Sequence, residues 1–207
     1  MQAVITADIV NSTCLTDEKL SRLMDDIREI IAWPDKIEFF RGDSYQAFIR
    51  QGTSALRKAV MCRLKAISYG EGARIDIRQS ISLGKVSKPV DSVGRHIEPV
   101  FVKSGRLFDK MATERRTTIT SELDPPFDLI LDILSRYIDE LISKVTVNQA
   151  IILNLLALNK SQTEVACILE KTPATVNKQI RASKYRDIEE LISDFEKLTQ
   201  KISEHGQ

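Results

Sequence analysis

The chain has 207 residues, 43% hydrophobic and 29% charged, which is long enough for one large domain or two small ones. Its 30 Lys and Arg residues nearly balance its 29 Asp and Glu residues, which excludes a global electrostatic pull toward nucleic acid or membrane. The longest apolar run, AIILNLLAL, is too short to span a bilayer, and no signal-peptide pattern opens the chain. Three widely spaced cysteines fit no metal site, so we expect reduced thiols in a cytoplasmic protein: Cys14, Cys62 and Cys167.

Strand and helix patterns alternate from residue 3 to about residue 122. The hydrophobic periodicity predicts strands over 3–9, 36–41, 44–50 and 74–84, and helices over 16–32, 53–68 and 99–112, with a further strand in RTTITSEL. The order strand, helix, strand, strand, helix, strand predicts an α+β domain of the ferredoxin-like type over residues 1–122.

Two acids at strand ends form the first candidate site. Asp8 lies near the end of the first strand, and Asp43 lies in the turn after the second. If these strands run parallel through a right-handed crossover, with the third strand between them, both carboxylates reach the same rim of the sheet. Two such carboxylates suit a divalent cation, although each acid taken singly is also an ordinary turn residue. Asn11 and Ser12 are candidate ligands for phosphate oxygens beside them.

Four segments carry a resemblance: ADIVNST, RGDSYQAF, IRQSISLGKVS and GRHIEPVFVKSGRLFDKM. In this order they resemble SatD-like proteins and, more remotely, the palm-like catalytic domain of class III nucleotidyl cyclases. The resemblance implies that Asp8 and Asp43 hold Mg²⁺ or Mn²⁺, with the carbonyl of Ile9, near a nucleotide. It also implies a phosphate-binding or catalytic role for Arg106, but Val102 stands where the cyclase pattern has Asn.

The chain after Asp124-Pro125-Pro126 reads as helical throughout, which predicts an all-α domain over residues 123–207. Helices are expected over 127–142 and 147–158, then over QTEVACILE, over about 173–184, and after residue 187. Ser161 with Glu164 forms a capping box, and Thr172 before Pro173 is a second N-cap signature. One small core is expected from apolar residues at helical spacing: Ile151, Leu155, Val165, Ala166, Leu169, Val176 and Ile180.

Three short helices with a turn between the last two predict a helix-turn-helix, and the segment resembles that of sigma-factor region-four-like regulators. Glu170 departs from the pattern where a turn Gly is common. Six basic residues and two acidic ones lie between Lys160 and Arg186, so the positive charge is concentrated here. The predicted DNA-binding residues are Thr172, Ala174, Thr175, Lys178, Gln179, Arg181 and Lys184, with Lys171 and Arg186 also suited to phosphates.

These patterns predict a cytoplasmic DNA-binding transcriptional regulator whose cyclase-like domain binds a nucleotide, a divalent metal or both. Ligand binding is expected to change how this domain packs on the helix over 127–142. A metal-dependent nucleotidyl-transfer enzyme and a protein-interaction adaptor are the alternatives. The last helix carries an apolar stripe at Ile188, Ile192 and Phe195. That stripe either covers the bundle or pairs with its copy in a homodimer.

Overall fold

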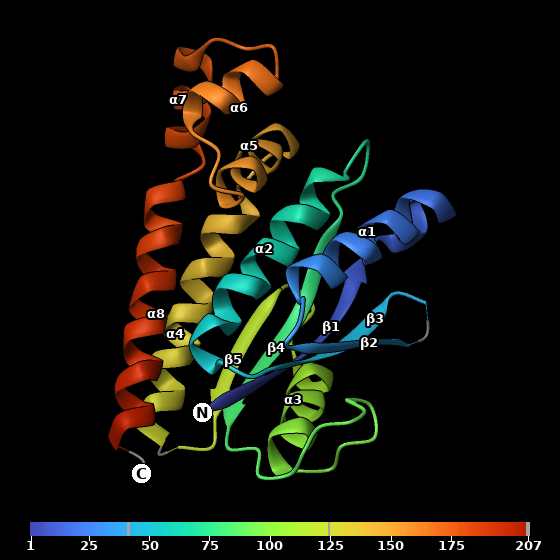
Figure 1. The fold of residues 1–207 in the computed structure, drawn as a ribbon, viewed down its shortest axis with the longest axis vertical. Coiled ribbons are helices and arrows are strands. Elements are labelled where there is room, and N and C mark those ends of the chain that lie inside the picture. Colours follow the sequence, from blue (N-terminus) through green and yellow to red (C-terminus); the bar gives the residue numbers. More distant parts are fainter. Residues whose placement is uncertain (41, 124, 206–207) are drawn as a thin grey trace.

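The computed structural model describes residues 1–40, 42–123 and 125–205, which form a five-stranded mixed sheet and eight α-helices (Figure 1). The strands are β1 (Gln2–Val10), β2 (Lys36–Phe40), β3 (Ser44–Ile49), β4 (Asp76–Gly84) and β5 (Thr117–Ser121). The α+β class and each predicted strand are confirmed, except that residue 41, the predicted end of the second strand, lies outside the described residues.

The helices are α1 (Asp17–Ile30), α2 (Ala55–Ser68), α3 (Pro99–Lys110), α4 (Pro125–Ser143), α5 (Val147–Ala157), α6 (Gln162–Ile168), α7 (Pro173–Ala182) and α8 (Tyr185–His205). The side chains of Thr16, Ser161 and Thr172 cap α1, α6 and α7 as predicted. Helix α4 begins two residues earlier than predicted, because proline fits the first turn of a helix, where no intrahelical donor is needed. No helix in the described ranges is long and apolar enough to cross a membrane.

The strand order in the sheet is β2-β3-β1-β4-β5. Strand β3 is antiparallel to both β1 and β2, so β1 and β2 run parallel with β3 between them, as the sequence predicts. Strand β4 is antiparallel to β1 and parallel to β5. This order puts the end of β1 and the turn after β2 at the same end of the sheet.

Both faces of the sheet are covered. Helices α1 and α2 pack on one face, where Ile5, Ile77 and Ile81 are buried, and α3 packs on the other across β1 and β4 (Figure 1). The alternation of polar and apolar residues along β4 suggests that one face of the strand is exposed to solvent, but Ser80 and Ser82 on that face are fully buried. Ser80 is satisfied there because its hydroxyl donates to the carbonyl oxygen of Ser104 on α3 at 2.8 Å.

The helical part is packed on the sheet part. Helix α4 lies against β5, α5 lies against α2, and α8 runs back along α4 (Figure 1). One continuous hydrophobic cluster joins the sheet to these helices, and it includes Ile138, Leu153 and Phe195. Charged pairs reinforce the contact, since Arg57 on α2 pairs with Glu189 and Glu196 on α8, each at 2.9 Å. Because of these contacts, a displacement of α2 or of the sheet edge would also displace the helices packed on them, α4, α5 and α8.

Helices α5, α6 and α7 enclose a second, small cluster. Its buried members are Ile152, Val165, Ala166 and Val176, with partly buried neighbours Leu155, Leu156, Leu169 and Ile180. The sequence predicted Ile151 in this core, but Ile151 is only half-buried and Ile152 is buried in its place. The face of α5 that packs inward is therefore shifted by one residue from the predicted face. The α6–α7 turn puts Glu170 at a φ of 53°, the left-handed conformation that a Gly would adopt more easily.

Candidate metal site and nucleic-acid interface

The carboxylates of Asp8 and Asp43 meet at one end of the sheet. Asp8 is paired with Ser44 across β1 and β3, and the N–H of Ile9 donates to the carbonyl oxygen of Asp43 at 3.2 Å. The hydroxyl of Ser44 donates to Oδ1 of Asp8 at 2.8 Å. The hydroxyl of Ser12 donates to Oδ2 of Asp43 at 2.5 Å. The chain order thus places both acids together, and two serines hold them in place.

The environment of Asp8 disfavours the charged form of its carboxyl group. Partial burial raises the pKa of Asp8 above its ordinary value, and the nearby Asp43 carboxylate raises it further. The hydrogen bond from Ser44 and the positive charge of Arg78 oppose this increase in the pKa. Arg78 is the register partner of Asp8 on β4, and its guanidinium donates to the carbonyl oxygens of Phe108 and Met111 at the end of α3. Repulsion between the two acids is therefore only partly compensated.

The donor set suits a hard divalent cation. Mg²⁺ prefers carboxylate oxygens and commonly uses only one or two of them, with water or phosphate completing its octahedron. Asp8 and Asp43 supply such a pair, and each keeps oxygen lone pairs beyond its serine hydrogen bond. No group of three or more His, Cys, Asp or Glu side chains within the described residues forms a fuller cage. A cation here would be held weakly by the protein alone and better with a phosphorylated ligand.

The two predicted phosphate ligands already have partners in the protein. Ser12 is buried and donates to Asp43, while the amide of Asn11 donates to the carbonyl oxygen of Arg74 at 2.8 Å. The guanidinium of Arg74 in turn donates to the carbonyl oxygens of Val145 and Ile142, at 2.8 and 2.9 Å. Those carbonyls lie at the end of helix α4 and in the turn before α5. The loop after β1, whose Ser12 hydroxyl donates to Asp43, is thus connected through Arg74 to the junction of α4 and α5.

Arg106 lies away from the two carboxylates. It is exposed on α3 and lines an open pocket of about 470 Å³ with Thr120 and Glu122 at the β5 edge. Asp43 adjoins β2 and β3 at the other edge of the sheet. No contact between the described residues joins Arg106 to either acid. The sequence pattern located this residue on a helix but could not show which way the helix turns it.

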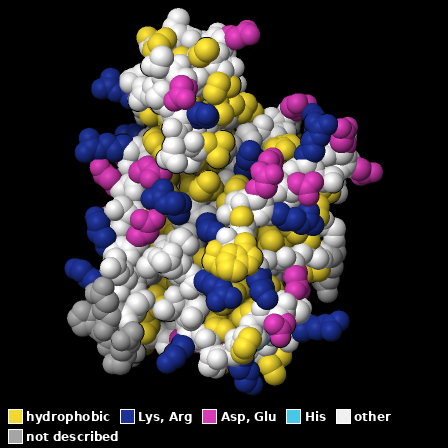
Figure 2. Space-filling view, in the orientation of Figure 1, with side chains coloured by type: hydrophobic (Ala, Val, Ile, Leu, Met, Phe, Trp, Pro, Cys, Tyr) yellow, Lys and Arg dark blue, Asp and Glu magenta, His cyan; other side chains and the backbone are white. Residues whose placement is uncertain are grey.

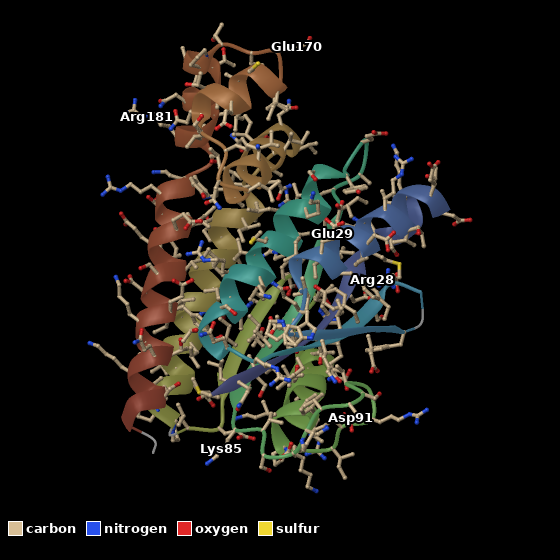
Figure 3. All side chains as sticks on the ribbon, in the orientation of Figure 1. Arg28, Glu29, Lys85, Asp91, Glu170 and Arg181 are labelled. Carbon is tan, nitrogen blue, oxygen red and sulfur yellow. The ribbon has the colours of Figure 1, made fainter. Side chains whose placement is uncertain are left out.

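The second candidate site is the outer surface of α7. Val176 is buried and Ile180 is partly buried on the small cluster, while the opposite side of the helix is open to solvent. The predicted DNA-binding residues Thr172, Ala174, Thr175, Lys178, Arg181 and Lys184 are exposed, and Gln179 is half-buried. Figure 3 shows Arg181 pointing outward from α7, and Figure 2 shows basic side chains along this edge of the molecule.

The basic residues of this region differ in whether an acidic side chain already pairs with them. Arg186 pairs with Glu190 at 2.8 Å, and Lys184 approaches Asp187 at 3.9 Å. Lys178 and Arg181 make no ion pair with any residue that the structure describes. Their charges are therefore available to a ligand, whereas Arg186 already has an acidic neighbour.

A pair of amides beside this surface was missed by the sequence analysis. Nδ2 of Asn177 on α7 donates to Oε1 of Gln162, the first residue of α6, at 3.1 Å. This leaves an acceptor oxygen on Asn177 and amide donors on Gln162 without a partner in this pair. The fifteen-residue separation hid the pair, because only the turn between α6 and α7 brings the two residues together.

The apolar stripe of the last helix is buried within the chain. Ile188, Ile192 and Phe195 belong to the main hydrophobic cluster. Helix α8 therefore covers the bundle, and this stripe is not available to a second copy.

No protein-family model matches this chain, and no curated protein matches it.

Proposed function

We propose that this protein is a cytoplasmic DNA-binding transcriptional regulator, in which a cyclase-like domain binds a divalent metal, a nucleotide or both. The observation that carries the proposal is the exposed polar and basic face of α7, opposite its buried side at Val176. Lys178 and Arg181 would contact phosphates. Thr175, Ala174 and the Gln162–Asn177 amide pair would face base edges.

The finer fold assignments belong to this proposal. The β2-β3-β1-β4 order is that of a ferredoxin-like domain, and it favours the resemblance to SatD-like proteins and to class III cyclase palms. The short turn between α6 and α7, with a small core beneath, favours a helix-turn-helix. The predicted division near residue 122 stays part of this proposal.

The two sites have a physical connection that supports regulation. A cation at Asp8 and Asp43 competes with the Ser12 hydroxyl for Oδ2 of Asp43. Displacing Ser12 moves the adjacent Asn11 and, through it, Arg74, which holds the carbonyls at the end of α4. We propose that this changes the position of α5 and with it α7. The ligand shifts this equilibrium only by its difference in affinity between the two arrangements.

The experiment is a DNA-binding titration over a series of salt concentrations, using DNA from the neighbourhood of the protein's own gene. Each lost phosphate contact reduces the slope of log K against log salt by about 0.9. The double variant Lys178→Ala/Arg181→Ala is expected to bind more weakly, with a slope smaller by about 2. Lys197→Ala, an exposed lysine on α8 paired with Asp194, is the matched control and is expected to bind normally. Absence of salt-dependent binding in the unmodified protein would refute the proposal.

The convergence of Asp8 and Asp43 also favours a second candidate, a metal-dependent nucleotidyl-transfer enzyme. This candidate predicts turnover of ATP or GTP with Mg²⁺ or Mn²⁺ that Asp43→Asn abolishes. A regulator would bind the same nucleotide without converting it. Arg106 argues against turnover, because it lies at the β5 edge and Val102 precedes it where an amide would be needed.

A further inference from the structure

Helix α4 carries an apolar stripe that its own chain leaves uncovered. Leu129, Ile133 and Tyr137 follow one another at intervals of four residues, with exposed fractions of 60%, 52% and 48%, and Ile130 beside them is 45% exposed. The buried face of the same helix is formed by Leu131, Leu134, Ile138, Leu141 and Ile142, so the stripe is a second apolar surface.

Such a surface is unusual for a chain that acts alone. Large apolar side chains scattered singly over a surface are normal, but a contiguous group this large on one helix marks an interaction site. Side chains at intervals of four residues form a ridge that is inclined to the helix axis and packs into the grooves of another helix. No other described helix exposes four large apolar side chains on one side.

The geometry points to a second copy of this chain as the occupant, with the two α4 helices antiparallel about a two-fold axis at Ile133. In that arrangement Ile133 meets its own copy, and Leu129 meets the partner's Tyr137. An antiparallel pairing is self-complementary, which a symmetric dimer requires. The inference does not depend on DNA binding by α7.

The charges at the ends of the stripe favour the antiparallel orientation. Glu140 lies seven residues after Ile133, and Pro126, in the first turn of α4, lies seven residues before it. In the antiparallel pair each Glu140 carboxylate therefore approaches the N-terminal turn of the partner helix, where the helix dipole favours negative charge. In a parallel pair the two Glu140 carboxylates, each paired with Lys144 of its own helix, would lie together at the C-terminal ends of both helices, where the helix dipole disfavours negative charge. Arg136, which pairs with Asp132 at 3.3 Å, lies at the rim and can cover apolar surface with its stem.

The test begins with sedimentation equilibrium over a wide range of protein concentrations. The unmodified protein is expected to form a concentration-dependent dimer. Ile133→Glu places two carboxylates on the axis and is expected to raise the dissociation constant about a hundredfold or more. Because Ile133 is half-exposed, this variant should keep its helix content by circular dichroism. Leu158→Glu, at a 63% exposed site after α5, is the matched control and should dimerise normally.

Cysteine crosslinking then tests the orientation. The exposed cysteines Cys14 and Cys167 are first replaced by Ser. Ile133→Cys is expected to form a disulfide-linked dimer by itself. Leu129→Cys and Tyr137→Cys are expected to crosslink when mixed but not separately. A protein that stays monomeric at every concentration, or a Leu129→Cys variant that crosslinks to its own copy, would overturn the inference.

Discussion

The hydroxyl of Ser12 donates to the carboxylate of Asp43 at 2.5 Å, although one residue follows β1 and the other precedes β3. This contact exists because β3 lies between β1 and β2, which brings the loop after β1 against the turn after β2. It keeps Asp43 in place beside Asp8 and occupies an oxygen that a cation would use. Ser12 is therefore both a support for the candidate metal site and a competitor for it.

Removing this competitor should strengthen cation binding. We expect Mn²⁺ or Mg²⁺ to raise the melting temperature of the protein, and a cation at about a hundredfold excess over its Kd stabilises by about 2.7 kcal/mol. Ser12→Ala should show a larger shift at the same cation concentration, and Asp43→Asn should show none. Calorimetry or thermal denaturation measures the shift. An equal shift in Asp43→Asn would place the cation elsewhere.

The raised pKa of Asp8 predicts a pH-dependent stability. The pKa of Asp8 is higher in the folded protein than in the unfolded chain, so protonation of Asp8 stabilises the fold at low pH. This contribution to the free energy of unfolding is lost as the pH rises through the folded-state pKa. Asp8→Asn should therefore stabilise the protein near neutral pH, by up to about 1 kcal/mol since solvent screens a half-exposed pair. The gain should vanish below about pH 4, where carboxyls are protonated. Urea denaturation at both pH values measures it.

Asp91→Asn is the control for this pH experiment. Asp91 lies exposed in the loop before α3 (Figure 3), and its carboxylate forms no ion pair with any residue that the structure describes. Its substitution should leave the free energy of unfolding unchanged at both pH values. A destabilising effect of Asp8→Asn at neutral pH would show that the charge of Asp8 is compensated in the fold.

The buried Arg63 should be essential for stability. It is fully buried on α2, pairs with Asp76 on β4 at 2.9 Å and with Asp139 on α4 at 2.6 Å, and links the sheet to the helical part. Arg63→Met removes the closest cation from both carboxylates and leaves Asp76 with Arg74 at 3.5 Å and Asp139 with Arg115 at 3.6 Å. Because the lost partner is fully buried, the variant should cost about 3–5 kcal/mol of unfolding free energy. Arg57→Met, six residues earlier on α2 and with partly exposed partners, should cost about 1 kcal/mol or less. Similar losses of unfolding free energy in Arg63→Met and Arg57→Met would contradict the expectation that the buried arginine matters more.

Arg74 should carry the connection between the acids and the helices. Arg74→Ala frees the carbonyls of Ile142 and Val145 and should increase amide hydrogen exchange in α5, α6 and α7 without unfolding the sheet. The carbonyl of Arg74 still accepts from Asn11, so the acid pair should keep its cation response. Arg116→Ala is the control, because its guanidinium donates to carbonyls of its own loop. Unchanged amide hydrogen exchange in Arg74→Ala would contradict the proposed connection between the acids and the helices.

The α6–α7 turn offers a stabilising substitution. Glu170 has a φ of 53°, and the N–H of Lys171 donates to the carbonyl of Ala166 across the turn at 2.9 Å. This is a Schellman-type helix end, where Gly is preferred. Glu170→Gly should stabilise by about 1 kcal/mol, the cost of the left-handed conformation for a residue with a side chain. Asn159→Gly, in the equivalent turn after α5 with a φ of 59°, should change little because Asn tolerates this conformation. Thermal denaturation measures both, and a loss of stability in Glu170→Gly would contradict the assignment.

Much of the architecture could be read from the chain alone. Periodicity fixed the strands and helices to within a few residues, and short-range chemistry fixed their starts at Thr16, Ser161 and Thr172. Even the meeting of Asp8 with Asp43 follows from connection rules, because a right-handed crossover leaves few topologies open.

Tertiary packing decided what periodicity cannot express. The same apolar pattern on α4 contains Ile138, which is buried, and Ile133, which is half-exposed, because only the neighbouring elements determine which side is covered. Packing also turned Arg106 toward β5 and enclosed Arg63 between two carboxylates. The sequence determines which residues share a face of one element, whereas burial and charge pairing depend on what lies opposite that face, and that exists only in the folded chain.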